Sequence, residues 1–397
     1  MRSVEAYRAA LGGSSEAPRA LVFREDFLAL SETFVRDHLL EMPRYRVAAL
    51  AASLNHPTLP VPGVPVHLLR AGSLAGRARQ FAGYRLGVAQ SRMVTAAARE
   101  VLDALRPDVL HAHFGPDAAL VSAAAAAARV PLVATFHGYD VTQDPESLRG
   151  GRTANTVLVD DWARVIERIA AVITVSSFLR DRLIARGVPS DKISVVACGV
   201  DTAAIPWSPP VVGGPVVFVG RLVEKKGLAD LLDAVAGLDR RPRVDVVGDG
   251  PLRVELEARA RRLGVDAHFL GSLPTPRVVE TIRSGAVVAM PSRTASSGDT
   301  EGLPVVSLEA SAAGRPVIGY RHAGLPEAVL DGSTGVLVAE GDVAALARAL
   351  GGALDDPVAL LGMSRAARAH VVSRFERSDL LSRVADVYDR VRRPAPR

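Results

Sequence analysis

Hydrophobic and polar positions alternate along this chain in two recurring patterns. Short runs rich in valine, isoleucine and leucine predict strands, and longer stretches between them repeat apolar residues at helical spacing. Because the two kinds of segment alternate almost throughout, the pattern predicts parallel sheets in doubly wound α/β domains. The predicted strands are residues 20–23, 47–50, 64–69, 108–113, 131–136, 171–176, 215–220, 243–248, 267–271, 286–290, 316–320 and 335–338. The predicted helices include residues 31–42, 88–105, 117–129, 227–237, 251–263, 304–313 and 342–352.

A proline- and glycine-rich stretch interrupts the alternation near the middle of the chain. Residues 202–215 read TAAIPWSPPVVGGP, which disfavours both helix and strand and predicts a linker. The length of 397 residues also exceeds what one ordinary core needs. We therefore expect Rossmann-like domains over 1–201 and 216–375, followed by a final helix within 376–397.

Composition narrows the class of protein. The single cysteine, Cys198, excludes a disulfide framework and favours a reducing compartment. The N-terminus lacks a continuous apolar core, so no signal peptide is expected. The most apolar window, residues 118–136, is interrupted by Arg129 and Pro131 and predicts a buried helix followed by a strand rather than a membrane span. A net charge of +5 is no nucleic-acid signature by itself.

The first predicted strand of the second domain ends in the sequence VGRLVEKKG. Gly220 lets the backbone turn, Arg221 and Lys226 follow, and Gly227 precedes a predicted helix. Two cations near a helix N-terminus suit a diphosphate, because side chains and the helix dipole neutralise its charge together. A solvated loop with two surface cations is the alternative.

Glycines also follow the next two predicted strands. Gly248 and Gly250 form a tight turn that cradles a nucleotide or only reverses the chain. A third glycine at the offset of a dinucleotide fingerprint is missing, so hydride transfer gains little support. Gly271 ends the strand 267–271, Leu273 follows it, and both are candidates to line a base pocket.

Two glutamates flank the start of the predicted helix 304–313. Pro304 suits the first helical turn, so Glu301 precedes the helix and Glu309 lies one to two turns inside it. A ligand there would meet free backbone amides from Gly302 to Val305. Each carboxylate can accept two hydroxyl donors, as from a sugar diol. Complementing the helix dipole explains Glu301 equally well but explains Glu309 poorly, because Glu309 has apolar neighbours at helical spacing.

Histidines mark two neighbouring strand ends of the first domain. The sequence DVLHAHFGPD carries His111 and His113, and PLVATFHGYD carries His137 and Asp140 one unit later. A structural role is the usual one for a lone histidine, whereas a substrate hydroxyl is the alternative partner. A zinc site from His111, His113 and His137 is conceivable, but no acidic ligand is evident and we expect no metal.

The loop after the first predicted strand offers two further polar candidates. Ser31 suits the N-cap of the helix that follows, and Glu32 is next to it. Both would lie at the same edge of the sheet as the histidines and would be able to touch a ligand. Helix capping alone accounts for them equally well.

Taken together, these motifs resemble the retaining GT-B glycosyltransferases of family GT4, and within them the colanic-acid and exopolysaccharide type. The resemblance covers nearly the whole chain. Its most specific element is the pair of glutamates in EGLPVVSLEA, followed by GRLVEKKG. The other matching segments are LSETFV, HAHFGPDAAL, TFHGYDV, VSSFLRDRLIARGVPSDKISVVACGVD, VVGDGPL and FLGSLP.

The resemblance implies two Rossmann-like domains facing across a cleft, with the final helix packing back on the N-terminal domain. It implies a nucleotide-sugar donor held mainly by the C-terminal domain and transferred with retention, without a required cofactor or metal. By position, Arg221 and Lys226 correspond to diphosphate ligands, Glu301 to a donor-sugar ligand and Glu309 to a ribose ligand. His137 corresponds to the histidine near the reacting carbon. On the acceptor side the candidates are Ser31, Glu32, His113 and Asp140.

The chain departs from the family pattern at two places. The loop after the first strand reads REDFLALSE instead of a glycine-rich sequence, and the frequent NGVD reads CGVD, with Cys198 in place of asparagine. We assign Cys198 no catalytic role. A sugar-nucleotide epimerase of the same fold and a non-catalytic sugar-nucleotide-binding protein are the competing functions. UDP sugars are favoured over GDP sugars as donors.

The sequence does not identify the acceptor of the sugar. A lipid-linked saccharide and a small molecule, as in natural-product glycosylation, are both open. Residues 70–99 contain six arginines and no acid, which suits a basic surface on anionic lipid, a soluble helical cover or a grip on an acidic acceptor. We expect a cytoplasmic enzyme, either soluble or peripheral to the inner face of the membrane.

Overall fold

The computed structural model describes residues 17–29, 32–54, 59–69 and 88–392. The chain divides into two compact units. Unit 1 contains most of residues 1–196 together with 378–397, and unit 2 contains 197–377 together with 176–178. The segment 202–215, expected as a linker, groups with unit 2. Within the described residues, the model has no helix both long and apolar enough to span a bilayer.

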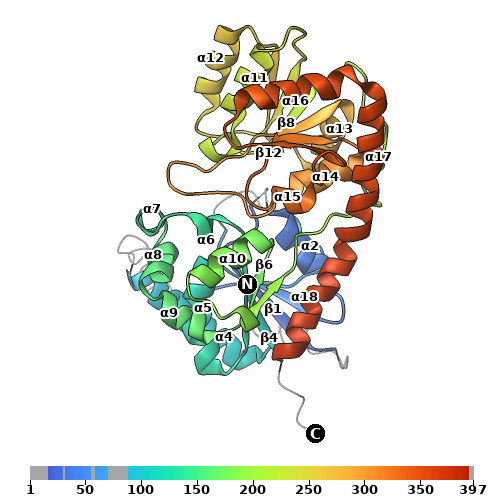
Figure 1. Cartoon of the computed structure of the whole chain (residues 1–397). Coiled ribbons are helices and arrows are strands. Elements are labelled where there is room, and N and C mark those ends of the chain that lie inside the picture. The colour runs from blue at the N-terminus through green and yellow to red at the C-terminus, as the bar shows by residue number, and fades with distance from the viewer. Residues whose placement is uncertain (1–16, 30–31, 55–58, 70–87, 393–397) are drawn as a thin grey trace. The chain divides into compact units, whose positions relative to one another are not determined.

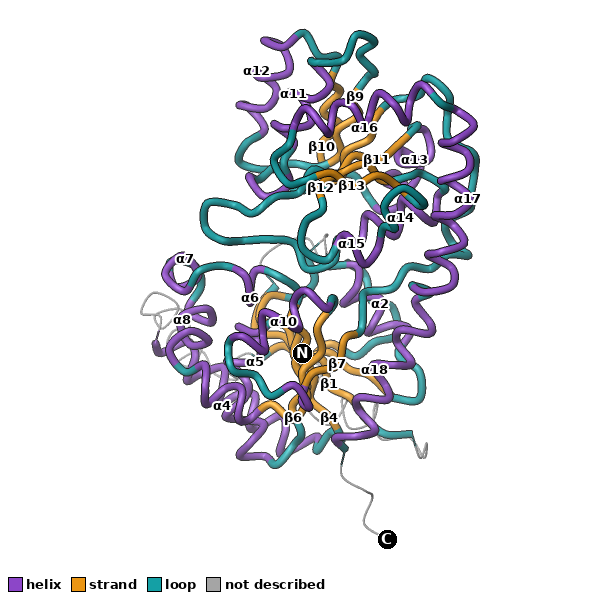
Figure 2. The backbone as a smooth tube through the Cα atoms, viewed as in Figure 1, coloured by secondary structure: helices purple, strands orange, loops and turns teal. Residues whose placement is uncertain are grey.

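Unit 1 is built on a parallel sheet of seven strands in the order β3-β2-β1-β4-β5-β6-β7. Its helices surround the sheet (Figures 1 and 2). The strands are β1 Arg19–Asp26, β2 Arg46–Ser53, β3 Val66–Leu68, β4 Val109–His113, β5 Leu132–Phe136, β6 Ile169–Thr174 and β7 Ile193–Val195. The helices are α2 Thr33–Glu41, α4 Val88–Leu105, α5 Gly115–Ala128, α6 Tyr139–Thr142, α7 Pro145–Arg149, α8 Thr153–Asp160, α9 Trp162–Arg168, α10 Ser177–Ala185, the 3₁₀ turn η1 Ser190–Lys192 and α18 Arg377–Val391.

Unit 2 repeats the design with six parallel strands in the order β10-β9-β8-β11-β12-β13. The strands are β8 Val216–Val219, β9 Val244–Val247, β10 Ala267–Gly271, β11 Val287–Met290, β12 Val317–Tyr320 and β13 Gly335–Val338. The helices are the 3₁₀ turn η2 Glu224–Lys226, α11 Leu228–Ala236, α12 Arg253–Leu263, α13 Thr275–Ser284, α14 Val305–Ala313, α15 Leu325–Ala328, α16 Val343–Asp355 and α17 Pro357–Arg374.

The predicted α/β fold is confirmed, and every predicted strand appears within two residues of its expected start. The central strands are buried on both faces, as expected for apolar runs in parallel sheets. In both sheets the order reverses next to the first strand, between β1 and β4 and between β8 and β11. Ligands of such folds bind beyond the carboxyl ends of the strands at this switch point.

The final helix, α18, belongs to unit 1. Tyr388 is completely buried, and its hydroxyl reaches His111 on β4 at 2.6 Å. Tyr45, just ahead of β2, bonds Asp389 at 2.8 Å, and Arg44 bonds Asp386 at 2.6 Å. The helix is therefore fixed to unit 1 both in the core and at the surface.

The segment 202–215 is held to unit 2 by a buried arginine. Arg315, at the entrance to β12, is 0 % exposed, and its guanidinium donates to the carbonyls of Ser208, Ala313, Gly314 and Arg283. Burial lowers the pKa of Arg315 to about 10, so the group remains a cation near neutral pH. Backbone carbonyls replace the water that the buried charge has lost.

We predict that Arg315→Met lowers the free energy of unfolding of unit 2 by about 3 kcal/mol, because several buried carbonyls lose a charged donor. Urea denaturation followed by tryptophan fluorescence measures the change, since Trp207 lies in the same segment. Arg277→Met, at an exposed site on α13, is the matched control and should change the midpoint little. Equal midpoints for both variants would contradict the prediction.

Candidate functional site

Glycine backbones meet at the carboxyl ends of β8, β9 and β10. The Gly220 amide donates to Val247, and the Gly248 amide donates to Gly271 at 2.8 Å. Gly248 has φ +131°, and a Cβ there would lie 2.0 Å from the carbonyl oxygen of Gly220. A Cβ at Gly250 would lie 2.5 Å from the carbonyl oxygen of Leu222. The strand-end glycines thus permit close backbone packing, and Leu273 lies two residues beyond the end of β10.

Three cations follow β8, and the structure separates their roles. Arg221 is exposed to solvent. Lys225 Nζ lies 2.9 Å from Asp299 and 3.3 Å from the Thr300 carbonyl, so it braces the loop before α14. Lys226 Nζ lies 2.9 Å from Glu301 Oε1, while its stem passes over Gly220. The structure therefore joins two predicted site residues, Lys226 and Glu301, in one ion pair.

Glu301 is only 9 % exposed. Its buried Oε1 lies 2.9 Å from Lys226 Nζ, so the carboxylate is paired with that ammonium. Burial would raise the pKa of Glu301, but Lys226 and Lys225 outweigh it and lower the pKa below its ordinary value. The site therefore holds an ionised carboxylate that still accepts a donor.

His322, which sequence reasoning missed, is a second buried polar group in this site. It follows the end of β12 and is 5 % exposed. Its Nδ1 lies 2.8 Å from Glu340 Oε2, which fixes the ring, whereas its buried Nε2 has no hydrogen-bond partner among the described residues. The charge of His322 is one of the causes that lower the pKa of Glu301. A histidine just after a strand end was the available signal, two residues after β12 here and one residue after β5 at His137.

The helix α14 starts one residue later than predicted, at Val305. Gly302, Leu303 and Pro304 are buried just ahead of it. The amides of Gly302, Leu303 and Val305 precede the helix's own i→i−4 bonds, so they are available to a ligand. Glu309 lies one turn in and is half-buried, at the margin of the apolar face rather than within it.

At the switch point of unit 1, β1 delivers Arg24 to a buried ionic cluster. Arg24 contacts Asp117 at 2.5 Å and Glu32 at 2.6 Å, and its guanidinium stacks over the Phe114 ring at 4.6 Å. Burial disfavours the cation, but the two carboxylates raise the pKa of Arg24 above its ordinary value. Glu32 occupies the N-cap position of α2 without a capping bond, and Ser31 lies outside the described residues.

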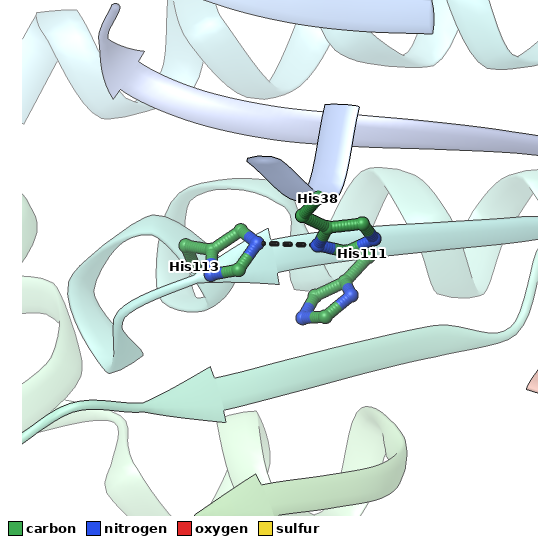
Figure 3. Close-up of side chains that lie close together, drawn as sticks. All are labelled: His38, His111 and His113. Carbon is green, nitrogen blue, oxygen red and sulfur yellow. Dashed lines mark hydrogen bonds between the residues drawn. The ribbon is translucent and has the colours of Figure 1, made fainter. Parts of the chain in front are cut away.

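Four histidines converge beside this cluster. His111 and His113 are two residues apart on β4 and so point to the same face of the sheet, where their rings stack at 4.5 Å. His38 comes from α2, with Nδ1 2.8 Å from His113 Nε2 (Figure 3). His137 follows β5, with Nε2 3.0 Å from His113 Nδ1. Sequence reasoning found three of the four and missed His38, which lies inside a helix with no distinguishing motif.

His137 is held by aromatic rings and by the loop that carries it. Its ring contacts Phe34 and Phe114, with centroid distances of 4.4 and 4.5 Å, and these two rings also contact each other edge to face. Asp140, predicted on the acceptor side, is 0 % exposed and accepts the backbone amides of His137, Gly138 and Gly115. Asp140 therefore supports the shape of the loop and the start of α5.

The ligand atoms of His38, His111 and His113 lie within 4.8 Å of one another, so these three side chains are able to hold a metal ion. Histidine alone suits zinc, copper or nickel better than magnesium. His38 takes the place that His137 had in the sequence-based alternative. However, both ring nitrogens of each of the three already have a hydrogen-bond partner. A metal would have to break those bonds, so the expectation of no metal stays a prediction.

Comparison with known proteins gives two family matches. Residues 46–204 match the model described as Glycosyltransferase Family 4, and residues 214–356 match Glycosyl transferases group 1. The two matches fall on unit 1 and unit 2 in that order. Each domain sequence therefore has a counterpart among the glycosyltransferases.

Curated relatives agree with these matches. A glycogen synthase of Mycobacterium tuberculosis is 31% identical over 305 residues, 74% of this chain and 72% of the relative. A putative colanic acid biosynthesis glycosyltransferase, WcaL of Escherichia coli, is 31% identical over 278 residues, 66% of each chain. A GDP-mannose-dependent phosphatidylinositol monomannoside mannosyltransferase of Mycolicibacterium smegmatis is 34% identical over 278 residues, 64% of this chain and 69% of the relative.

Among solved structures, HepE of Anabaena in complex with UDP and glucose superposes with a TM-score of 0.76 at 20% identity. The match covers 94% of this chain and 100% of that one. At this identity the likeness concerns the fold, which is the two-domain GT-B architecture. The predicted fold family is thereby confirmed.

The buried histidines make the stability of unit 1 dependent on pH. Burial lowers the pKa of His38 to about 4 and of His137 to about 3, and lowers those of His111 and His113 well below their ordinary value. In the unfolded chain all four titrate near 6.5. The unfolded state therefore binds more protons below about pH 6.5, and stability falls as the pH drops from there toward 4.

We predict that His111→Gln reduces the slope of the free energy of unfolding against pH by up to about 1.4 kcal/mol per pH unit, which is the contribution of one proton. Denaturant unfolding at several values between pH 6.5 and 4 measures the slope. Buried Asp140 and Glu25, whose pKa values burial raises, oppose the trend in both proteins and cancel in the comparison. His268→Gln, at a half-exposed site in unit 2, is the control. An unchanged slope for His111→Gln would refute the prediction.

Proposed function

Because the chain belongs to the family 4 glycosyltransferases with the GT-B fold, we propose that it transfers a hexosyl unit with retention from a nucleotide-diphosphate sugar to an acceptor hydroxyl. UDP sugars are the favoured donors and GDP sugars the alternative. The setting is polysaccharide or natural-product biosynthesis. Membership of the family makes the chain a glycosyltransferase, whereas the donor, the stereochemistry and the acceptor belong to the proposal.

One observation carries the proposal, namely the buried and unpartnered Nε2 of His322 close to the buried ion pair of Glu301 and Lys226. A buried polar atom without a partner is costly, which is a reason to expect a ligand at this place. The paired carboxylate of Glu301 can accept a further donor beside it. A sugar hydroxyl both donates and accepts, so it satisfies either protonation state of His322 and the carboxylate of Glu301. Neighbouring hydroxyls on one ring suit this pair of atoms.

The groups around Glu301 suit the rest of a nucleotide sugar. Arg221, Lys226 and the amides at the start of α14 would bind the diphosphate, and Glu309 would bind the ribose. Negative charge grows on the leaving phosphate in the transition state, so fixed cations and amides lower the barrier by electrostatic preorganisation. No metal is needed for this stabilisation.

The path of the reaction follows from the groups available. Among the residues that the structure describes, no carboxylate is clearly placed as a covalent nucleophile, which favours a front-face mechanism. In it the acceptor oxygen bonds to the anomeric carbon while the bond to the leaving phosphate breaks, and a phosphate oxygen takes the acceptor's proton. His137 is proposed to contact the transferred sugar near the reacting carbon, and Glu32 and His113 remain acceptor-side candidates.

The identity of the donor is supported only indirectly. The HepE complex contains UDP and glucose, and the mannosyltransferase relative is named for GDP-mannose. On the acceptor, the basic segment 70–99 lies largely outside the described residues, and only its part from residue 88 is in α4. A membrane contact through this segment therefore remains a proposal.

Two competing functions differ in what they need. An epimerase would interconvert nucleotide sugars with no acceptor present, whereas a binding protein would not turn over with any acceptor. None of the matches described above is named as an epimerase. Incubation with the donor alone and then with hydroxyl acceptors separates all three.

We predict that Glu301→Gln lowers kcat for transfer on the order of 100-fold while the protein stays folded, because an amide cannot match the ionised acceptor. Lys226→Ala and Arg221→Ala should lower transfer as well. Transfer from radiolabelled UDP-glucose to the best acceptor measures the effect. Lys225→Ala tests a general effect of charge and should cost less, since Lys225 pairs with Asp299 and not with Glu301. Full activity in the first three variants would refute the assignment.

We predict that Glu309→Ala weakens binding of the nucleotide itself, because its proposed partner is the ribose. A thermal-shift titration with UDP, GDP and their sugars measures this, since a ligand of the folded state raises Tm by mass action. Wild type should show a rise with one nucleotide series, and Glu309→Ala should need about tenfold more nucleotide for the same rise. Glu301→Gln should retain its response to the free nucleotide. An identical titration for Glu309→Ala and wild type would contradict the ribose assignment.

A further inference from the structure

Six side chains of unit 1 form a single file of hydrogen bonds through its core. They come from α2, β4, β5, the loop after β5 and α18. In order, the groups are Thr135, His111, Tyr388, His38, His113 and His137. The five donor–acceptor distances in the same order are 2.7, 2.6, 2.9, 2.8 and 3.0 Å. Each of the four groups between Thr135 and His137 hydrogen-bonds to the group before it and to the group after it.

The four histidines of the file are neutral at physiological pH. His38, His111 and His113 are at most 4 % exposed. Burial is the first cause that lowers the pKa of each of the four rings, and neighbouring histidines or Arg24 add to it for His111, His113 and His137. A neutral imidazole has one N–H and one lone pair. Each ring therefore donates on one side and accepts on the other.

If each hydrogen bond of the file contains one proton and Tyr388 donates its own, only two arrangements of protons are possible. Tyr388 has one hydroxyl proton, so it donates to His38 or to His111 and accepts from the other. If it donates to His38, all four histidines are protonated on Nδ1. If it donates to His111, all four are protonated on Nε2. The tautomer of His137 is thus tied to that of His111 through the tyrosine.

Thr135 decides between the two arrangements. Its side chain is buried, and the only partner of Oγ1 among the described residues is His111 Nε2. In the Nδ1–H arrangement Thr135 donates its proton to that nitrogen. In the reverse arrangement Thr135 accepts, and its own proton is buried without an acceptor. The Nδ1–H arrangement instead leaves the N–H of His137 without a protein acceptor, but His137 is only partly buried and its Nδ1 is not enclosed. Because the enclosed donor of Thr135 is the more costly one to leave unsatisfied, the Nδ1–H arrangement should dominate.

We propose that this file is a tautomer relay, in which Thr135 and Tyr388 act as positioning residues that hold His137 as an Nδ1–H donor. No hydrogen bond of the described residues uses His137 Nδ1, and Phe34 and Phe114 both pack against the ring. The relay thus presents one N–H of fixed direction at the end of β5. Its value to catalysis rests on the proposed contact of His137 with the sugar, whereas the relay itself does not.

A metal ion on His38, His111 and His113 is the main alternative for this cluster. Such an ion would take lone pairs that the relay uses between rings and would break at least the link between His38 and His113. The hydrogen-bonded file explains both nitrogens of every ring without an ion. The test must therefore exclude a bound metal directly.

The experiment is long-range ¹H–¹⁵N correlation on the full chain labelled at its nine histidines, with single His→Gln variants for assignment. The expected result is four rings in the Nδ1–H form, although free imidazole side chains favour Nε2–H. Spectra should not change with EDTA. Mixed tautomers among the four rings, or ring signals that move when EDTA removes a bound metal, would overturn the relay.

Variants test the coupling. Thr135→Val removes the group that sets the direction, so the signals of all four rings should move together toward Nε2–H, and Thr135→Ser should restore them. In a Tyr388→Phe background, Thr135→Val should no longer affect His137. Tyr45→Phe removes a hydroxyl that also contacts α18 but lies outside the file, so it is the matched control. A shift confined to His111 in Thr135→Val would refute the coupling.

Activity provides a separate readout. Thr135→Val and Tyr388→Phe should lower kcat by up to about tenfold, the worth of one neutral hydrogen bond, with little change in the donor KM. Thr135→Ser should recover the rate. If the tautomers behave as expected but the rate does not change, the relay stands and the contact of His137 with the sugar falls. If the chain shows no transfer at all, the NMR result still decides the relay.

Discussion

Parallel strands end at the same edge of a sheet, and the chemistry of both units depends on this constraint. In unit 2 the loops after β8, β11 and β12 carry Lys226, Glu301 and His322. In unit 1 the ends of β4 and β5 place His113 and His137 within hydrogen-bonding distance. Residues distant in sequence become neighbours because each crossover returns the chain to the same side. The sheet thus acts as a positioning device for polar groups.

The two units use that edge in opposite ways. Unit 2 leaves the buried Nε2 of His322 without a partner near the ion pair of Glu301 and Lys226, which is unfavourable until a ligand pairs with it. In unit 1 the ring nitrogens of the four clustered histidines are hydrogen-bonded, except for His137 Nδ1 at the end of the file. The first arrangement leaves a polar atom available to a ligand, and the second fixes the orientation of the side chains. A transferase needs both, since it must hold its donor and orient it.

Sequence reasoning predicted the fold well because strands buried on both faces read as continuous apolar runs. It missed β7, whose three residues give too little pattern. Lys226 and Glu301 were found because the strand ends and the start of α14 are marked by glycine and proline. His38 and Tyr388 were not found, because each looks like an ordinary member of an amphipathic helix. Their role arises from contacts across 75 and 350 residues, which no local pattern encodes.

Tyr388 also bears on the order in which the protein is made. Unit 1 begins the chain, but its core is closed by a tyrosine that follows the whole of unit 2. During synthesis, His38 and His111 therefore lack their tyrosine partner until α18 has left the ribosome. Unit 2 has all its strands by then and is able to fold first. The unit whose strands are translated first is thus completed after the other.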